Sequence, residues 1–229
     1  MTDDERYEKL REVADALRAN LPKSIDVAAL GVMSKVPFQV LSLREALIWR
    51  TDELLHSAIQ SLEQKDISVS AMLARALIEN TALLFRLVAI FEKRVDLDPQ
   101  ELNDQLMALL FGSREWSDGP QAINILTCVG HANEEFEGLD KIYAELSEYA
   151  HPNWKGVMGL YSKLDRENHR ARFGREFVGY ERIKSRILSA LLIAAILFKH
   201  RYNKISDDMP DYLKTLEPIW PELANDRLK

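Results

Sequence analysis

The chain of 229 residues is 47% hydrophobic and 29% charged, which excludes wholesale disorder and allows a core large enough to fold without disulfide bonds. Only 9 Gly and 8 Pro are present, about 7% of the chain against a usual share of roughly 12%, which favours long helices over turn-rich sandwiches and barrels. The net charge of −6 excludes a protein that coats nucleic acid over its whole surface, although it allows a local basic patch.

A single cysteine, Cys128, excludes an intramolecular disulfide and any CxxC metal site, and it favours a reducing, cytoplasmic location. The N-terminus is acidic and lacks the apolar stretch of a secretory signal. The most apolar run, residues 187–198, is shorter than the roughly 20 residues that a membrane span needs. We therefore expect a buried core helix there and no membrane partner. No motif points to a cofactor, and none is expected.

Helix-start signals recur along the chain. Thr2-x-x-Glu5 and Ser42-x-x-Glu45 have the capping-box pattern, and prolines bracket a connector over 22–37. Apolar residues then recur at helical spacing. The predicted helices span about 2–20, 43–65, 68–94, 98–112, 120–135, 139–150 and 180–202.

One stretch departs from this pattern. Four of the nine glycines lie between Gly156 and Gly179, and residues 170–173 alternate with period two. Residues 165–168 are a plausible turn. We predict a β-hairpin within 157–175, with an ordered loop as the alternative.

These elements predict an all-α fold, a bundle of six to eight helices with one small hairpin insertion. A single domain is expected, with an N-terminal helix and connector over 1–37, the core bundle over 38–205, and short helices over 206–229. The helices at 68–94 and 180–202 should form its centre. Their apolar surface exceeds what a small bundle covers easily, so a homodimer or other homo-oligomer is expected.

The helix at 68–94 carries a polar stripe. Its charged residues Arg75, Glu79 and Arg86 fall within about 40° of one another, and the first two are an i, i+4 pair. Two interpretations are open. The stripe is either the solvated face of the helix or it faces an interior cleft, where paired charges mark a site.

A second candidate group ends the helix at 139–150. Tyr143, Ser147 and His151 are spaced by four residues and share one face. His151 followed by a proline is typical of a helix stop, and the alternative is an exposed imidazole that serves as acid, base or ligand. A Ser-His pair on one helix lacks a third group to orient the ring, so serine catalysis is not expected.

Metal ligation is a weaker alternative. Glu53-x-x-His56 and Glu148-x-x-His151 match the Glu-x-x-His pairs of di-metal bundles. However, Glu53 and Glu148 lie off the apolar faces of their helices, so no metal site is predicted.

The segment 163–186 is the strongest electrostatic signal. It holds eight basic and four acidic residues, a local balance of +4 that leaves −10 for the rest of the chain, and aromatic residues are interleaved. Basic groups neutralise phosphates and aromatic rings stack on bases, so we single out four candidate ligand-binding residues: Arg166, Arg170, Arg172 and Arg175. The alternative is an exposed hairpin with ordinary solvated charges.

Two short motifs carry a family resemblance: Arg75-Ala-Leu-Ile-Glu79 and Tyr143-x-x-Leu-Ser147-x-x-x-His151-Pro152. Together, across about residues 43–200, they resemble a group of all-helical bacterial proteins, some of which are related to the HEPN superfamily of helical nucleic-acid-associated domains. The resemblance implies a helical bundle, dimerisation, and RNA cleavage or nucleotide binding.

The HEPN ribonucleases carry an Arg before the His, with four to six residues between them. In this sequence Ala144, Glu145 and Leu146 stand at those places before His151. A formal match, Arg50 to His56, lies on an early helix, and roughly one such match is expected by chance.

Two functional hypotheses follow. The first is a HEPN-like module, non-enzymatic or weakly enzymatic, that binds nucleic acid or nucleotide. It would use the basic segment 163–186 and four further residues: Arg75, Glu79, Tyr143 and His151. The second is a helical interaction or scaffold protein without small-molecule chemistry. Convergence of Arg75, Glu79, Tyr143 and His151 in one cleft would favour a site.

Overall fold

The structure, a computed structural model, describes residues 1–26, 34–93, 98–115, 118–175 and 179–216. Over this part of the chain it contains eight helices and one antiparallel two-stranded hairpin, which confirms the predicted all-α bundle with a small β insertion. In chain order the elements are α1 (Asp3–Ala19), α2 (Val36–Glu63), α3 (Ile67–Glu92), α4 (Pro99–Phe111), α5 (Ile125–Glu135), α6 (Leu139–Ala150), α7 (Met158–Tyr161), β1 (Ser162–Asp165), β2 (Arg170–Phe173) and α8 (Tyr180–Leu216).

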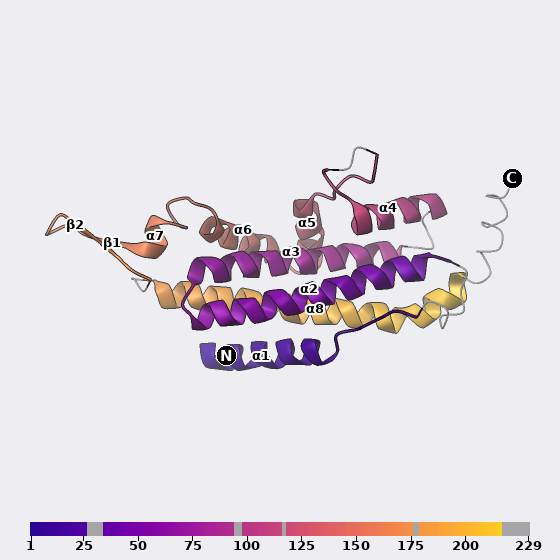
Figure 1. Cartoon of the computed structure of the whole chain (residues 1–229), viewed down its shortest axis with the longest axis horizontal. Coiled ribbons are helices and arrows are strands. Elements are labelled where there is room, and N and C mark those ends of the chain that lie inside the picture. The colour runs from indigo at the N-terminus through magenta and orange to yellow at the C-terminus, as the bar shows by residue number, and fades with distance from the viewer. Residues whose placement is uncertain (27–33, 94–97, 116–117, 176–178, 217–229) are drawn as a thin grey trace.

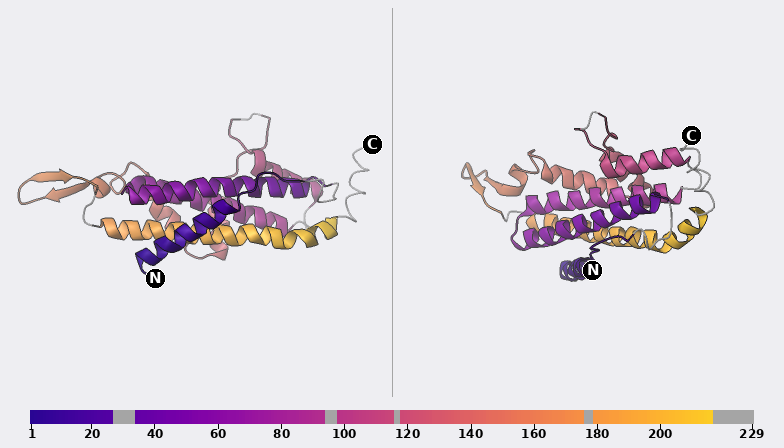
Figure 2. Two further views of the ribbon diagram at one scale, coloured as in Figure 1. Left: turned by 60° about the horizontal axis from the view of Figure 1, so that its bottom comes forward. Right: turned by 45° about the vertical axis from the view of Figure 1, so that its right-hand side comes forward.

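Helix α3 is the centre of the molecule. It packs against α2 and α8, which run alongside it, and against α4, α5 and α6 (Figure 1). Helix α1 crosses α8 and α2 on the far side of the bundle, as the two turned views in Figure 2 show. The chain itself thus covers most of α3, including its buried polar residue Asn80, whose amide donates to the Leu47 carbonyl and to Thr51 Oγ1 of α2. The apolar surface that led us to expect a dimer is therefore largely used within one chain.

Local signals set some helix starts and mislead at others. The capping box at α1 forms as predicted, with Thr2 Oγ1 accepting from the Glu5 amide and Glu5 accepting from the Thr2 amide. The box predicted at Ser42 is wrong, because α2 already begins at Val36 with Pro37 in its first turn. A proline is tolerated there because the first-turn amides have no helical acceptor.

Helix α5 also starts later than predicted. It begins at Ile125 rather than near residue 120, and Asn124 caps it by accepting from the Leu126 amide. An Asn at this position satisfies a free helical amide better than the prolyl start proposed upstream.

The predicted boundary at residue 205 falls inside α8, and the expected short helices are wrong for residues 206–216. The helix passes through Pro210 to Leu216, whereas residues 217–229 lie outside the described part. Buried Met209 and Tyr212 hold this last part against the bundle, and the Tyr212 ring lies 4.6 Å from that of Phe91. This packing offsets the cost of an interior proline.

The hairpin extends from one end of the bundle (Figure 1). Its register pairs Ser162 with Phe173 and Asp165 with Arg170, so residues 166–169 form the loop, within the region predicted. Asp165 closes this loop by accepting from the Asn168 amide and side chain. The short helix α7 leading into β1 was not predicted.

Within the described residues, the helices lack a stretch long and apolar enough to cross a bilayer.

Candidate functional site

The polar stripe of α3 meets α6. Arg75 Nε donates to Glu79 Oε1 at 3.1 Å and to the Tyr143 hydroxyl at 3.2 Å, while that hydroxyl donates to Glu79 Oε1 at 2.8 Å. The guanidinium carbon also lies 5.1 Å from the centroid of the Tyr143 ring, a cation–π distance. Three of the four residues whose convergence would favour a site are thus in direct contact, and they bridge two helices.

The same combination of residue types recurs elsewhere in the described chain. In each case an Arg and a Tyr hydroxyl meet on one Glu carboxylate, and we call such a group an Arg–Glu–Tyr clamp. The three further clamps are Tyr7, Arg11 and Glu63 between α1 and α2; Arg44, Glu45 and Tyr202 between α2 and α8; and Glu145, Tyr149 and Arg186 between α6 and α8. In the first two of these, the guanidinium again lies over the ring.

The chemistry of the clamp at Arg75 is that of a structural contact. Burial raises the pKa of the Tyr143 hydroxyl, and its hydrogen bond to Glu79 raises that pKa further, against the opposing effect of Arg75. The phenol therefore stays protonated at neutral pH and is not poised as a base. Because four helix contacts share the arrangement, we interpret Arg75, Glu79 and Tyr143 as joining α3 to α6.

The rest of the second candidate group does not join this clamp. Ser147 Oγ donates to the Tyr143 carbonyl at 2.8 Å, one turn back along its own helix. His151 caps α6, with its amide donating to the Ser147 carbonyl at 3.0 Å, and its side chain is exposed. The chain turns tightly after His151. The turn brings Gly156 so close that a Cβ there would lie 2.0 Å from the His151 carbonyl oxygen. This arrangement supports the helix-stop interpretation.

Neither Glu-x-x-His pair belongs to a cluster of metal-ligand side chains in the described part of the chain. His56 Nδ1 lies 3.1 Å from Asp52 Oδ1, and the same carboxylate accepts from Arg18 of α1 at 2.9 Å. Glu53 and Glu148 are exposed. Among the residues that the structure describes, no three His, Cys, Asp or Glu side chains gather as metal ligands do.

The hairpin has two chemically different faces. Successive residues of a strand point to opposite sides, and cross-strand partners share a side. Lys163, Arg170 and Arg172 therefore share one face with Asp165, and all three cations are exposed. The opposite face holds Ser162 and three apolar residues, Leu164, Ala171 and Phe173. The Leu164 and Phe173 side chains are 61% and 73% exposed. Such an apolar face on an isolated hairpin is unusual without a partner.

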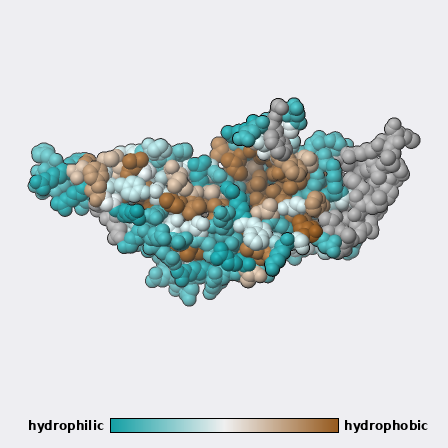
Figure 3. Space-filling view, viewed as in Figure 1, coloured by the Kyte–Doolittle hydropathy of each residue, from teal (hydrophilic) through white to brown (hydrophobic). Residues whose placement is uncertain are grey.

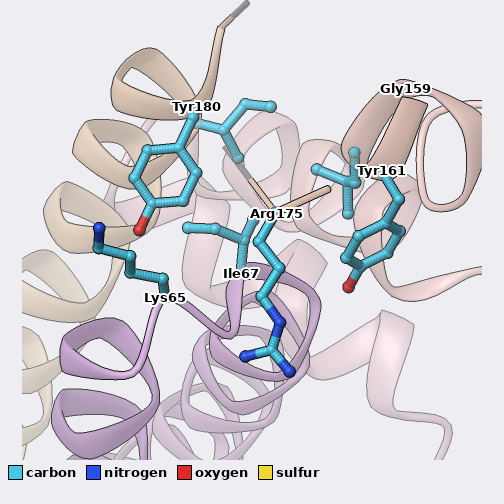
Figure 4. Close-up of a pocket in the computed structure, with 8 residues that line it drawn as sticks. Lys65, Ile67, Gly159, Tyr161, Arg175 and Tyr180 are labelled. Carbon is cyan, nitrogen blue, oxygen red and sulfur yellow. The ribbon is translucent and has the colours of Figure 1, made fainter. Parts of the chain in front are cut away.

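The base of the hairpin is fixed to the turn between α2 and α3. Arg175 pairs with Asp66, and the Tyr161 hydroxyl lies 2.6 Å from Ser68 Oγ. Figure 4 shows the Arg175 side chain between Tyr161 and Tyr180, directed towards this turn. Of the four arginines singled out as ligand-binding, Arg175 is thus an anchor, while Arg166, Arg170 and Arg172 lie on the hairpin beyond it.

The ion pairs of these three arginines are few. Arg172 lies 3.7 Å from Asp165, an exposed pair of small energetic value. Among the described residues, Arg166 and Arg170 have no carboxylate within ion-pair distance. Their positive charges are available to an external anion.

One further group of polar residues was not recognised from the sequence as a unit. Arg86, Cys128 and His131 line a groove between α4 and α5. Arg86 belonged to the predicted stripe, but no spacing rule connects it to residues 42 and 45 positions later.

Comparison with protein-family models, with curated proteins and with solved structures found no match to this chain.

Proposed function

We propose that the protein binds single-stranded nucleic acid and that the hairpin is its contact surface. The observation that carries this proposal is the strand register, which gathers Lys163, Arg170 and Arg172 on one exposed face. Cations spaced along an extended ribbon can neutralise successive phosphates. The HEPN-like resemblance is compatible with this role, and the proposal requires no cleavage.

An exposed aromatic side chain near the hairpin in the chain supports a single-stranded ligand. Trp154, on the loop before α7, is 73% exposed. Unpaired bases stack on such rings, and one stacked base contributes about 1–3 kcal/mol. Unpaired bases are accessible for such stacking in a single strand, whereas a duplex keeps them inside the helix.

The test is fluorescence anisotropy with a fluorescein-labelled twelve-nucleotide uridine RNA. Arg170→Glu combined with Arg172→Glu should weaken binding at least about tenfold, because two phosphate contacts become repulsive. The slope of log affinity against log salt should also fall by about 1.4, since each single-strand contact contributes about 0.7.

The matched control is Arg50→Glu combined with Arg114→Glu. Both residues are exposed and distant in sequence from the hairpin, and the change in net charge is identical. Equal loss of affinity in both double variants would mean that only net charge matters and would overturn the proposal, as would unchanged binding in the hairpin variant.

A second candidate function is protein interaction, in which the hairpin binds a second copy of the chain through its apolar face. The exposure of Leu164 and Phe173 favours it. Homo-oligomerisation is in this case a property of the hairpin rather than of α3 and α8.

A further inference from the structure

The groove between α4 and α5 is floored by α3. Its lining residues come from all three helices and from the segment before α5. They border a hollow that is open to solvent, with a volume of about 700 Å³ when the open solvent at its mouth is included. Figure 3 shows a hydrophobic, hollowed surface at this position. The apolar part of the lining includes Ile90, Ala108 and Ile123.

The charge in this groove is unusual. Arg86 is half-buried, and its guanidinium donates to the neutral side-chain oxygen of Gln105 at 3.2 Å. Among the described residues, Arg86 has no carboxylate within ion-pair distance, although Gln105 in turn donates to exposed Glu101. A half-buried cation held by a neutral amide keeps most of its hydrogen-bonding capacity, because a guanidinium has five N–H donors.

Other polar groups of the groove also favour an anionic ligand. His131 lies on the groove wall, and the first turn of α5, capped by Asn124, carries the positive end of a helix dipole. Cys128 is 1% exposed and burial raises the pKa of its thiol, although the Arg86 charge opposes this. A protonated, buried thiol is not a nucleophile, so the groove is suited to binding rather than to covalent chemistry.

We propose that this groove binds a small organic carboxylate, with the carboxylate on Arg86 and an apolar body against Ile90 and Ile123. One cation in a mainly apolar groove matches one negative charge. A phosphate dianion would bring a second charge close to Glu101. Planar carboxylates also match the fork of a guanidinium. This binding site is separate from the nucleic-acid surface proposed for the hairpin.

The probes are sodium octanoate and its neutral counterpart 1-octanol, both measured by titration calorimetry on the full chain. Octanoate should bind at least about tenfold more tightly, which corresponds to about 1.4 kcal/mol. Arg86→Gln should remove this preference and leave octanol unchanged. The matched control Arg50→Gln, on an exposed position of α2, should retain it.

A second measurement tests the binding site without using the Arg86→Gln variant. Octanoate should shift the methyl NMR signals of Ile90 and Ile123, and Ile123→Trp should fill the groove and weaken both ligands. Equal affinity of octanoate and octanol, a preference that survives in Arg86→Gln, or methyl signals that do not move would each overturn the proposal.

Discussion

The Glu side chains of the Arg–Glu–Tyr clamps each face two different partners. A carboxylate that accepts from both a guanidinium and a phenol satisfies more of its lone pairs than a simple ion pair does, and it fixes the rotation of one helix against another. The clamp at Glu45 is the most buried of the four, with the Arg44 and Glu45 side chains 11% and 12% exposed. Its contribution to stability should therefore be the least screened by solvent.

Tyr202 in this clamp has a distinct titration. Burial, followed by its hydrogen bond to Glu45, raises the pKa of its hydroxyl from 10.0 to about 12. Since the folded state then holds the proton more tightly than the unfolded state, the associated stability is complete below pH 10. It is lost as the pH rises from 10 to 12.

Between pH 10 and 12 we expect the free energy of unfolding to fall further for the wild type than for Tyr202→Phe. The difference between the two decreases should reach at most about 2.7 kcal/mol. Subtracting the ultraviolet absorbance titration of Tyr202→Phe from that of the wild type isolates the signal of the Tyr202 phenolate, which should form with a midpoint near pH 12. A midpoint near pH 10 would contradict the assignment.

At the scale of elements, α8 is the clearest case of packing that overrides a local signal. Pro210 removes one backbone donor and disfavours the preceding turn, yet the helix continues because Met209 and Tyr212 are buried on its inner face. The proline itself is exposed. It therefore weakens the helix without contributing to the core.

Pro210→Ala should raise the free energy of unfolding by about 1–2 kcal/mol, measured by urea denaturation. The restored hydrogen bond and helix propensity, about 3 kcal/mol at most, outweigh the entropy that the unfolded chain regains. Asp207→Ala, an exposed change on the same helix, is the control and should stay within about 0.5 kcal/mol. A destabilised alanine variant would show that the proline is required for the direction of the last turns.

At the scale of the whole molecule, the bundle is a frame that carries two separate surfaces. The hairpin lies at one end of the bundle (Figure 1) and is fixed there by Arg175 and Tyr161. The groove at Arg86 lies between α4 and α5. Because α3 is covered by its neighbours in the same chain, association with a second copy would have to use an exposed surface, and the hairpin offers one.

Self-association through the hairpin predicts a dimer that forms with rising concentration in sedimentation equilibrium. Leu164→Lys combined with Phe173→Lys should keep the chain monomeric, because each change places a charge on the apolar face. Ile196→Lys, an exposed change in the middle of α8, should not affect dimerisation. Dimers that persist in the hairpin variant but disappear with Ile196→Lys would place the interface on α8.

Much of this architecture could be predicted from local chemistry. The scarcity of Gly and Pro indicated a helical chain, while the capping box at Thr2 and the alternation at 170–173 act within a few residues and correctly predicted the start of α1 and the hairpin. Periodicity likewise placed Arg75 and Glu79 on one helix face. It could not indicate that Tyr143 of another helix would complete the clamp, or that His151 would remain outside it.

Only the tertiary structure decided which charges are neutralised. Arg86 and Arg175 look alike along the chain, but the first meets a neutral amide and the second meets Asp66. Similarly, the burial of Tyr212 carries α8 past a proline that local rules treat as a stop. The physical reason is the same in each case. Helix formation depends on neighbours three or four residues away, whereas the partners of Arg86 and Arg175 and the burial of Tyr212 depend on contacts between residues distant in sequence.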